Sequence, residues 1–275
     1  MVMTNLATDD ALPTLADRLR STSVEAGLGV QVADVHPGQV DLHVPLRPGY
    51  VAADGRLSPV VAGIVADVAV GTSAFAPASE PQSGVTVELR VDHVAGPAPT
   101  ARRLEISGRV LGLDGGTATG RAEIRDDLGN LVAHAVGVLA VDGPGKGLDP
   151  SAAPGPLAPF EATKIAPIPQ SDGTAYADIS PGMLNRRGTV HGGVLMGLAG
   201  EAHELFLGPD RGRRRLQLSM NYLRPASAGG HLILRSQFAR RGRRVCAVRT
   251  ELLDINDKLV AVAYGTSAPP CDDDR

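Results

Sequence analysis

Two long stretches of almost only apolar residues stand out along the chain. They run near Pro59–Ala74 and Gly192–Leu207, and each is too long for a single buried strand. Because apolar residues occur on nearly every side of the helical wheel, each stretch predicts a helix that other elements surround. The pattern therefore predicts one central helix in each half of the chain.

Alternating apolar and polar positions follow each predicted helix. In the first half they predict strands near Val85–Val91, Leu104–Leu111, Thr117–Ile124 and Leu131–Val141, and the second half has counterparts. One helix followed by consecutive strands favours an antiparallel α+β fold over alternating strand–helix units. We expect each sheet to curl around its helix.

The two halves are weakly similar and have the same order of elements. Arg47–Ser58 aligns with Ser180–His191 at an offset of 133 residues, and the last strands align at Gly137 and Gly265, an offset of 128. Residues 143–159 between the halves are rich in Gly and Pro, which disfavour helices and central strands. The predicted organisation is a first domain at 1–142 with an N-terminal helix, a linker at 143–159 and a second domain at 160–275.

Composition argues against several classes of protein. The net charge is −3 and only 3% of residues are aromatic, so a nucleic-acid partner is disfavoured. The chain has 2 Cys and no zinc-like spacing of Cys and His, so we expect neither a structural metal nor a disulfide framework. No apolar run approaches ~18 residues, and the amino terminus lacks signal-peptide features. We therefore expect a cytoplasmic protein without a membrane partner.

A spaced motif lies at the start of the second predicted helix. Asn185, Gly188, His191, Gly192 and Gly193 resemble the Asn, Gly and His-Gly-Gly pattern of hotdog-fold acyl-CoA thioesterases of the phenylacetic-acid-degradation (PaaI) type. The resemblance implies a double hotdog, with two antiparallel sheets that each wrap one long central helix. In that family two hotdogs pair back to back, with active sites between them. We expect the two sheets to join along one edge into a continuous sheet.

The resemblance also indicates where a catalytic acid belongs. The family places it nine residues after the motif His, but the second half has Gly200 there, with Glu201 one residue further on. The first half has Ser58 in place of the His and has Asp67 nine residues later. In the family the acid and the oxyanion-hole Gly come from opposite subunits. The resemblance therefore implies one composite site, in which Asp67 meets the Gly192–Gly193 pair.

The residue types fit thioester hydrolysis, although each has a simpler interpretation. Asp67 interrupts an apolar helix, which favours a general base or nucleophile over a core Asp paired with Arg or backbone donors. The N–H groups of Gly192 and Gly193 can stabilise an oxyanion at a helix start, or they belong only to a Gly-rich turn. For Asn185 and His191, roles in positioning water or the thioester compete evenly with a turn residue and a structural His.

A second, inactive site is also expected. Ser58 and Pro59 fit a helix N-cap and a first-turn Pro, and Pro59 has no N–H to offer an oxyanion. We therefore expect Glu201 and Ser58 to mark a site that has lost its chemistry. In a simpler interpretation, Glu201 and Glu204 belong to a solvated stripe.

Arginines are concentrated in the second half of the chain. Arg186, Arg187, Arg213, Arg214 and Arg215 are candidates for binding the phosphates of CoA, because guanidinium groups bind phosphate through charged hydrogen bonds. Solubility is the alternative explanation, since Arg is the usual cation of this chain.

The predicted function is hydrolysis of an acyl-CoA thioester to a free acid and CoA. No metal or redox cofactor is expected, because CoA is part of the substrate. A non-catalytic acyl-CoA binding protein with degenerate sites is the alternative. A hotdog enoyl-CoA hydratase/dehydratase is disfavoured because neither helix region has an Asp followed five residues later by His. Pairing of chains into a homodimer is a further expectation.

Overall fold

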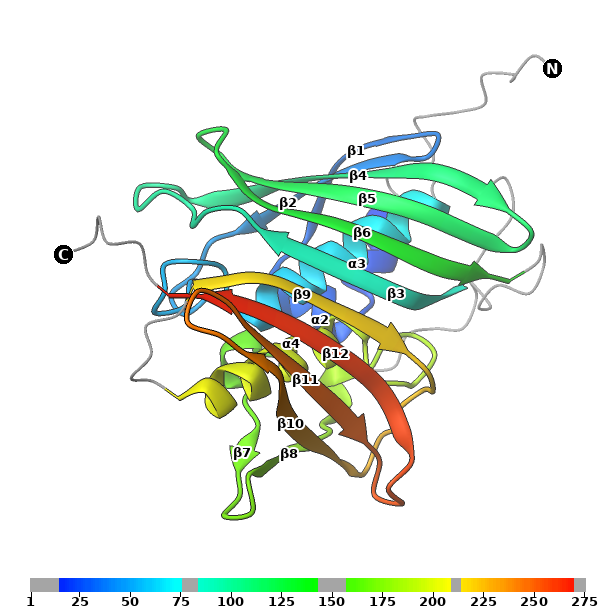
Figure 1. Cartoon of the computed structure of the whole chain (residues 1–275). Helices are drawn as coiled ribbons and strands as arrows, with labels where there is room; N and C mark the ends of the chain where they lie inside the picture. Colours follow the sequence, from blue (N-terminus) through cyan, green and yellow to red (C-terminus); the bar gives the residue numbers. More distant parts are fainter. Residues whose placement is uncertain (1–14, 76–83, 143–156, 209–213, 270–275) are drawn as a thin grey trace.

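The strands of the chain form one antiparallel sheet, with helices on its inner side (Figure 1). The computed structural model describes residues 15–75, 84–142, 157–208 and 214–269. The first half supplies β1 (Gln31–His36), β2 (Gln39–Pro45), β3 (Gly84–His93), β4 (Arg103–Asp114), β5 (Thr117–Asp126) and β6 (Leu131–Val141). The second half supplies β7 (Ile168–Pro169), β8 (Thr174–Asp178), β9 (Arg214–Tyr222), β10 (His231–Arg241), β11 (Cys246–Leu253) and β12 (Leu259–Ala268).

Each half has one long helix, as the apolar stretches predict. These helices are α3 (Pro59–Phe75) and α4 (Gly192–Leu207), and most of their side chains are buried. The shorter helices are α2 (Ser23–Leu28), η1 (Ala162–Lys164) and η2 (Pro181–Met183), and residues 15–20 are also helical. None of the helices in the described ranges has the length and apolarity that crossing a membrane requires.

The two halves join through a single pair of strands. The strand order is β1-β2-β4-β5-β6-β3-β9-β12-β11-β10-β8-β7, so β3 and β9 form the junction. They pair antiparallel from Glu88 opposite Asn221 to Asp92 opposite Gln217. The structure therefore has one large sheet, as the expected joining of the two sheets predicts, and the description as two distinct sheets is not confirmed. The backbone hydrogen bonds of the β3 and β9 edges are used in joining the halves.

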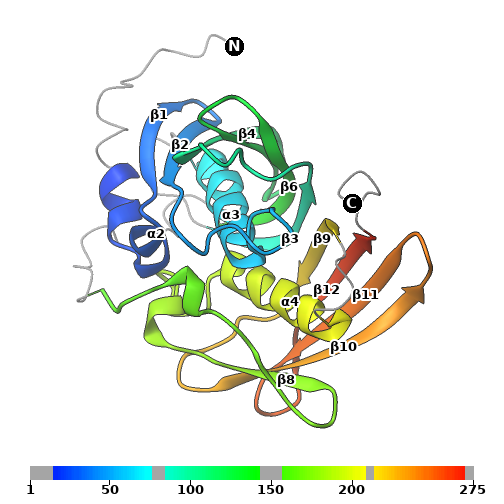
Figure 2. The ribbon, with the colours of Figure 1, turned by 90° about the vertical axis from the view of Figure 1, so that its left-hand side faces the viewer.

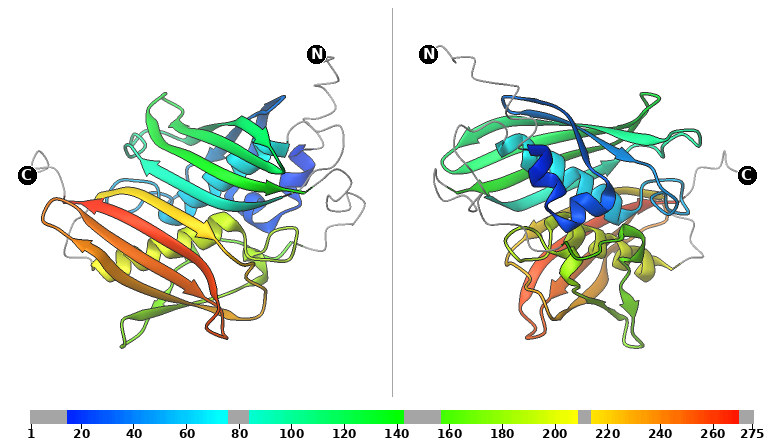
Figure 3. Two further views of the ribbon diagram at one scale, coloured as in Figure 1. Left: turned by 45° about the vertical axis from the view of Figure 1, so that its right-hand side comes forward. Right: turned by 180° about the vertical axis from the view of Figure 1, so that it is seen from behind.

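The sheet curls around α3 in the first half and over α4 in the second (Figures 2 and 3). Of the predicted linker at 143–159, residues 143–156 lie outside the described ranges, so the division into domains stays a prediction.

Helices α3 and α4 lie in direct backbone contact because glycines face the neighbouring helix. A Cβ atom at Gly193 would lie 2.4 Å from Ile64 Cα, and one at Gly197 would lie 2.6 Å from Val60 Cα. Only a residue without a side chain fits at such distances. This close approach brings the start of α4 against the middle of α3, where Asp67 lies.

Candidate active site

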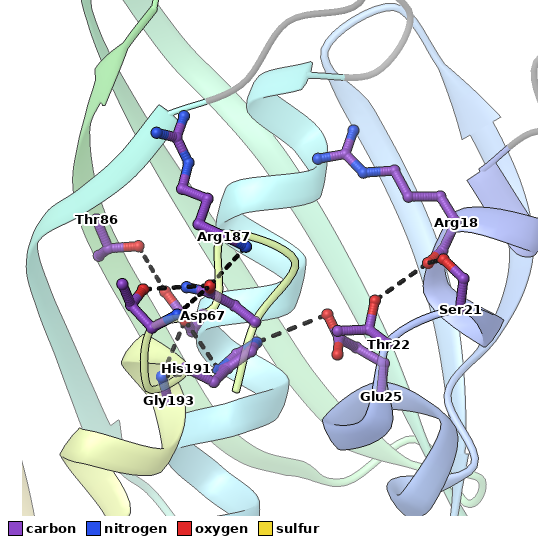
Figure 4. Close-up of polar contacts among 11 residues, drawn as sticks. Arg18, Ser21, Thr22, Glu25, Asp67, Thr86, Arg187, His191 and Gly193 are labelled. Atoms are coloured by element: carbon purple, nitrogen blue, oxygen red, sulfur yellow. Dashed lines mark hydrogen bonds and ion pairs between the residues drawn. The ribbon is translucent and has the colours of Figure 1, made fainter. Parts of the chain in front are cut away.

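Asp67 projects from α3 toward the first turn of α4, away from the core of its own half (Figure 4). The Asp67 Oδ2 atom accepts a hydrogen bond of 2.9 Å from the Gly193 N–H, and Oδ1 accepts one of 2.6 Å from the Thr86 hydroxyl. Its side chain is 10% exposed. The structure thus brings Asp67 of the first half together with the glycine pair of the second half. Thr86, on β3, is a partner that the sequence analysis did not identify.

The two glycine N–H groups have different surroundings. The Gly193 N–H donates to Asp67 Oδ2 and also lies 3.1 Å from His191 Nδ1, so it already has an acceptor in Asp67. The Gly192 N–H has no hydrogen-bond partner among the described residues. A Cβ at position 192 would lie 2.8 Å from Asp67 Oδ2. Gly192 therefore has the N–H that is available to an oxyanion, whereas Gly193 orients the carboxylate.

His191 is the N-cap of α4 and lies between two carboxylates. Its Nδ1 atom is 3.3 Å from Asp67 Oδ2, and its Nε2 atom is 3.6 Å from Glu25 Oε1. Burial acts to lower the pKa of His191, but the hydrogen bond and charge of Glu25, together with the charge of Asp67, outweigh it and raise that pKa. Glu25 was also missed in the sequence. The sequence signal that could have identified Glu25 is an acidic residue between apolar positions of a short helix.

Asn185 stabilises the loop that precedes α4. Its side-chain oxygen accepts hydrogen bonds from the Arg187 N–H at 2.9 Å, the Thr189 N–H at 3.3 Å and the Thr189 hydroxyl at 3.2 Å. Gly188 in the same loop has a φ of +72°, which glycine adopts without strain. The amide oxygen of Asn185 is therefore used within the turn, although the residue also lines the cavity described below.

Tyr222, at the end of β9, is a further polar residue of the site. Its hydroxyl donates a hydrogen bond of 3.0 Å to the Gly192 carbonyl oxygen. Burial, followed by the charge of Asp67, raises the pKa of Tyr222 well above its ordinary value. Tyr222 thus remains a neutral hydrogen-bond donor that fixes the first peptide of α4.

A cavity of about 570 Å³ opens beside Asp67. Such a volume lies in the range of small-molecule sites. Its apolar wall includes Leu19, Val68, Phe75, Val85, Leu139 and Leu195, and its polar part includes Asp67, Thr86, Asn185, His191, Gly192 and Tyr222. Glu25 also lines it. Among the described residues, no group of three or more His, Cys, Asp and Glu side chains could hold a metal ion.

Arginines surround this cavity, although they are not all those predicted. Arg186 and Arg187 line it as expected, and Arg187 forms an ion pair with Asp142. Arg18 and Arg224 line it as well, although neither was among the predicted phosphate-binding residues. Burial and the charge of Arg186 lower the pKa of Arg18, whereas the charge of Glu25 opposes this shift.

Of the predicted run Arg213–Arg215, neither Arg214 nor Arg215 lines this cavity. Arg213 lies outside the described residues. The Arg214 Nε atom lies 3.4 Å from the Pro269 carbonyl oxygen. Arg215 is 3% exposed and donates hydrogen bonds to the Leu57 carbonyl oxygen at 2.9 Å and to Glu204 at 3.1 Å. A phosphate cannot reach this buried guanidinium, so the prediction for Arg215 was wrong.

Arg215 instead occupies the position in the second half that corresponds to Thr86 of the first half. Thr86 is opposite Leu139 of β6, and Arg215 is opposite Ser267 of β12. Leu139 and Ser267 are related by the 128-residue offset of the repeat. The Arg215 side chain extends to the start of α3, where the equivalent of the Asp67 site would lie.

The second half-site is closed by this arrangement. A Cβ at Gly200 would lie 2.4 Å from Pro59 Cβ, so α4 packs directly on Pro59. The Ser58 hydroxyl accepts a hydrogen bond of 3.3 Å from the Val61 N–H, as expected of an N-cap.

The two glutamates of α4 do not form a solvated stripe. Glu204 pairs with buried Arg215, and burial raises its pKa. Burial also raises the pKa of Glu201 to about 7, against the opposing charge of Arg215. The surroundings of Glu201 differ from those of Asp67, because the charge of Arg215 acts on Glu201 and Pro59 packs on the neighbouring Gly200.

Comparison with known proteins identifies the fold and a domain. Residues 180–268 match the family described as the acyl-CoA thioesterase N-terminal domain. The tesB protein of Mycobacterium avium subs paratuberculosis superposes with a TM-score of 0.65 at 10% identity, covering 90% of this chain and 98% of that chain. A hotdog-fold protein from Alicyclobacillus acidocaldarius superposes with a TM-score of 0.56 at 11% identity, covering 92% and 98%. The chain has the hotdog fold.

An acyl-ACP thioesterase from Bacteroides thetaiotaomicron has a similar structure, with a TM-score of 0.59 at 15% identity over 84% of this chain and 98% of that chain. The sequence matches none of the curated proteins with which it was compared. The domain match includes the motif from Asn185 to Gly193 and supports a thioester hydrolase as the class of enzyme. The more specific likeness to the PaaI type stays a prediction.

Proposed function

We propose that this protein is an acyl-CoA thioesterase with one composite site between two fused hotdog units. The hydrogen bond from the Gly193 N–H to Asp67 Oδ2 carries the proposal, because it joins the two halves at 2.9 Å inside a cavity. In this assignment the acyl group lies along the apolar wall, and the thioester carbonyl carbon lies beside Asp67.

The described groups suggest a division of labour in the reaction. The Gly192 N–H, favoured by the dipole of α4, donates to the carbonyl oxygen as it becomes negative. Asp67 either takes a proton from the attacking water or attacks the carbonyl carbon itself. If water attacks, the carbon–sulfur bond breaks and the acid forms directly. If Asp67 attacks, the same bond breaks to leave a mixed anhydride between Asp67 and the acyl group, and water then hydrolyses this anhydride to the acid and free Asp67. In both cases the CoA thiolate takes up a proton and leaves as its thiol. Thr86 and Gly193 hold the Asp67 carboxylate in one orientation.

The arginines around the cavity support CoA as the carrier of the acyl group. Arg18, Arg186 and Arg187 line the cavity. In this assignment their guanidinium groups bind the phosphates of CoA through charged hydrogen bonds. We propose that no metal or redox cofactor takes part, that the protein is cytoplasmic, and that two chains can pair through the hotdog sheet.

A thiol-release assay over CoA esters of short, long and aromatic acids tests the proposal, with the same acyl groups on acyl carrier protein as a second carrier. Hydrolysis of at least one CoA ester, lost in Asp67→Asn, is expected. Binding of CoA esters without turnover would instead identify an acyl-CoA binding protein. Preference for the carrier protein would contradict the assignment of CoA, but not that of the hydrolase.

A single-turnover reaction in ¹⁸O water distinguishes the two roles of Asp67. Direct attack of water places ¹⁸O in the released acid during the first turnover. After attack by Asp67, water that opens the mixed anhydride at the Asp67 carbonyl carbon leaves the ¹⁸O in the Asp67 carboxylate, where mass spectrometry of the peptide detects it. Label in Asp67 therefore identifies the covalent route.

A further inference from the structure

Glu25 is a buried carboxylate for which the proposed reaction has no role so far. It lies on α2, is 8% exposed and lines the cavity. Its Oε2 atom is buried and has no hydrogen-bond partner among the described residues. A buried carboxylate is costly unless a positive charge or hydrogen-bond donors compensate it. The group nearest to this role is His191, whose Nε2 atom is 3.6 Å from Glu25 Oε1.

The His191 ring lies between Glu25 and Asp67 (Figure 4). Its Nδ1 atom has two neighbours that require opposite protonation states. It accepts from the Gly193 N–H at 3.1 Å only without a hydrogen, and it donates to Asp67 Oδ2 at 3.3 Å only with one. The Gly193 N–H lies closer to Asp67, at 2.9 Å, and is satisfied there. A ring protonated on both nitrogens therefore serves both carboxylates.

Charges on the surrounding elements favour this protonated ring. Despite its burial, the pKa of His191 is raised, chiefly by Glu25 of α2 and then by Asp67 of α3. Arg18 is the cation that interacts with Glu25, and Arg186 of the loop before α4 acts in turn on Arg18. Tyr222 of β9 remains neutral. With a neutral ring, two carboxylates would lie close together without a cation between them.

We propose that Glu25 is a positioning residue: its carboxylate holds the His191 ring against Asp67 and stabilises the ring in its protonated form. The catalytic consequence rests on the proposed thioesterase function. The positive ring and the Asp67 carboxylate attract each other, which holds the carboxylate in place for the reaction. A short helix outside the strand–helix–strand repeat thus completes the site.

In the described part of the second half, no hydrogen bond or ion pair joins an acid to the corresponding position. The element before its first strand is the one-turn helix η1, and its Thr163 side chain contacts Gly49. The residue that aligns with His191 is Ser58, which needs no charge partner.

Titration of the histidine Cε1–H signals by NMR tests the inference without any substrate. The His191 signal is assigned by its loss in His191→Gln. In Glu25→Gln, which keeps size and removes charge, we expect the His191 pKa to fall by about one unit, the scale on which a nearby charge acts. Glu161→Gln, which changes an exposed glutamate paired with Lys164, is the matched control and should leave it unchanged. An unchanged His191 pKa in Glu25→Gln would overturn the proposal.

Kinetics against pH provide the second readout. In the parent enzyme kcat should fall as pH rises through the His191 pKa, and in Glu25→Gln this fall should occur at lower pH with KM unchanged. Glu25→Asp should give an intermediate profile, and it is used if Glu25→Gln fails to fold. A change confined to KM would identify Glu25 as a substrate contact and overturn the positioning role. If the parent has no activity, the proposed function fails, and the NMR titration still decides the question.

Discussion

The carboxylate of Asp67 is held from two sides, by a hydroxyl of the sheet and an N–H of the opposite helix. Two hydrogen bonds compensate for much of the cost of burying a charge. They also fix the direction in which the remaining lone pairs point. The site is therefore organised before a substrate enters.

Removing the charge of Asp67 should abolish turnover while preserving the fold. In Asp67→Asn the amide oxygen can still accept from the Gly193 N–H, and the amide nitrogen can donate to Thr86. We expect kcat to fall by about 100-fold or more, the scale of a lost general base, with little change in melting temperature. Steady-state kinetics and thermal unfolding measure both. Normal turnover in this variant would refute the assigned role.

A methyl group at position 192 should disturb the carboxylate and leave the core intact. The Cβ atom of Gly192→Ala would lie 2.8 Å from Asp67 Oδ2, a side-chain atom that can move away. We expect loss of activity with nearly parental stability. Gly112→Ala is the control, because a Cβ there has nothing within 4 Å. If both variants hydrolyse substrate equally well, the Gly192–Asp67 contact is unimportant for turnover.

At the scale of elements, the two long helices have taken different roles. Helix α3 supplies Asp67, whereas α4 supplies the glycine pair and carries Glu201 in a closed environment. Because Glu201 binds its proton more tightly in the folded chain than in the unfolded chain, the contribution of Glu201 to stability falls as pH rises from about 4.5 to about 7 and is constant above that.

Glu201→Gln should therefore stabilise the protein in a pH-dependent way. Above pH 7 the variant lacks the cost of ionising a half-buried carboxylate, which solvent screening reduces to about 1 kcal/mol. At pH 4 both proteins are neutral at this position and should melt at similar temperatures. Thermal unfolding at pH 4 and pH 8 tests this, with Glu161→Gln as the exposed control. Turnover should stay near the parental value, and a variant without activity would show that the two half-sites were assigned in reverse.

The elements were predictable from sequence to a large extent, and the contacts between them were not. Long apolar runs predicted α3 and α4 because no amphipathic alternative fits them. Asp67 was identifiable as a carboxylate in such a run. The burial of Arg215 was not, because its position opposite Ser267 depends on the strand register. Glu25 and Tyr222 were missed because only tertiary packing brings them to the site, and a sequence pattern does not show which distant residues pack together.

At the scale of the whole molecule, the difference between the two half-sites leaves one open site per chain. The first half-site has a cavity ringed by arginines, and Pro59 and Arg215 fill the second. A non-hydrolysable acyl-CoA analogue should therefore bind with a stoichiometry of one per chain.

Arg18 and Arg186 should govern how tightly CoA binds. In Arg18→Gln and Arg186→Gln we expect KM to rise several-fold and kcat to change little, because the phosphates lie away from the reacting carbonyl. The difference from the parent should shrink at high salt, where charges on the surface are screened. Arg243→Gln, an exposed change of the same charge, is the control. An unchanged KM at low salt in both variants would remove these arginines from CoA binding.

The junction of β3 with β9 has a consequence for the chain's ancestry and its engineering. If two copies of the first half paired along β3, each Asp67 would face Ser58 and Pro59. If two copies of the second half paired along β9, each glycine pair would face Gly200. Neither homodimer contains an acid opposite a free N–H. Covalent fusion therefore ensures that a first half always pairs with a second half, the only pairing that gives a productive site. Each half can then lose the component that the other retains. As a result, neither half can be inherited or engineered as an active enzyme without the other.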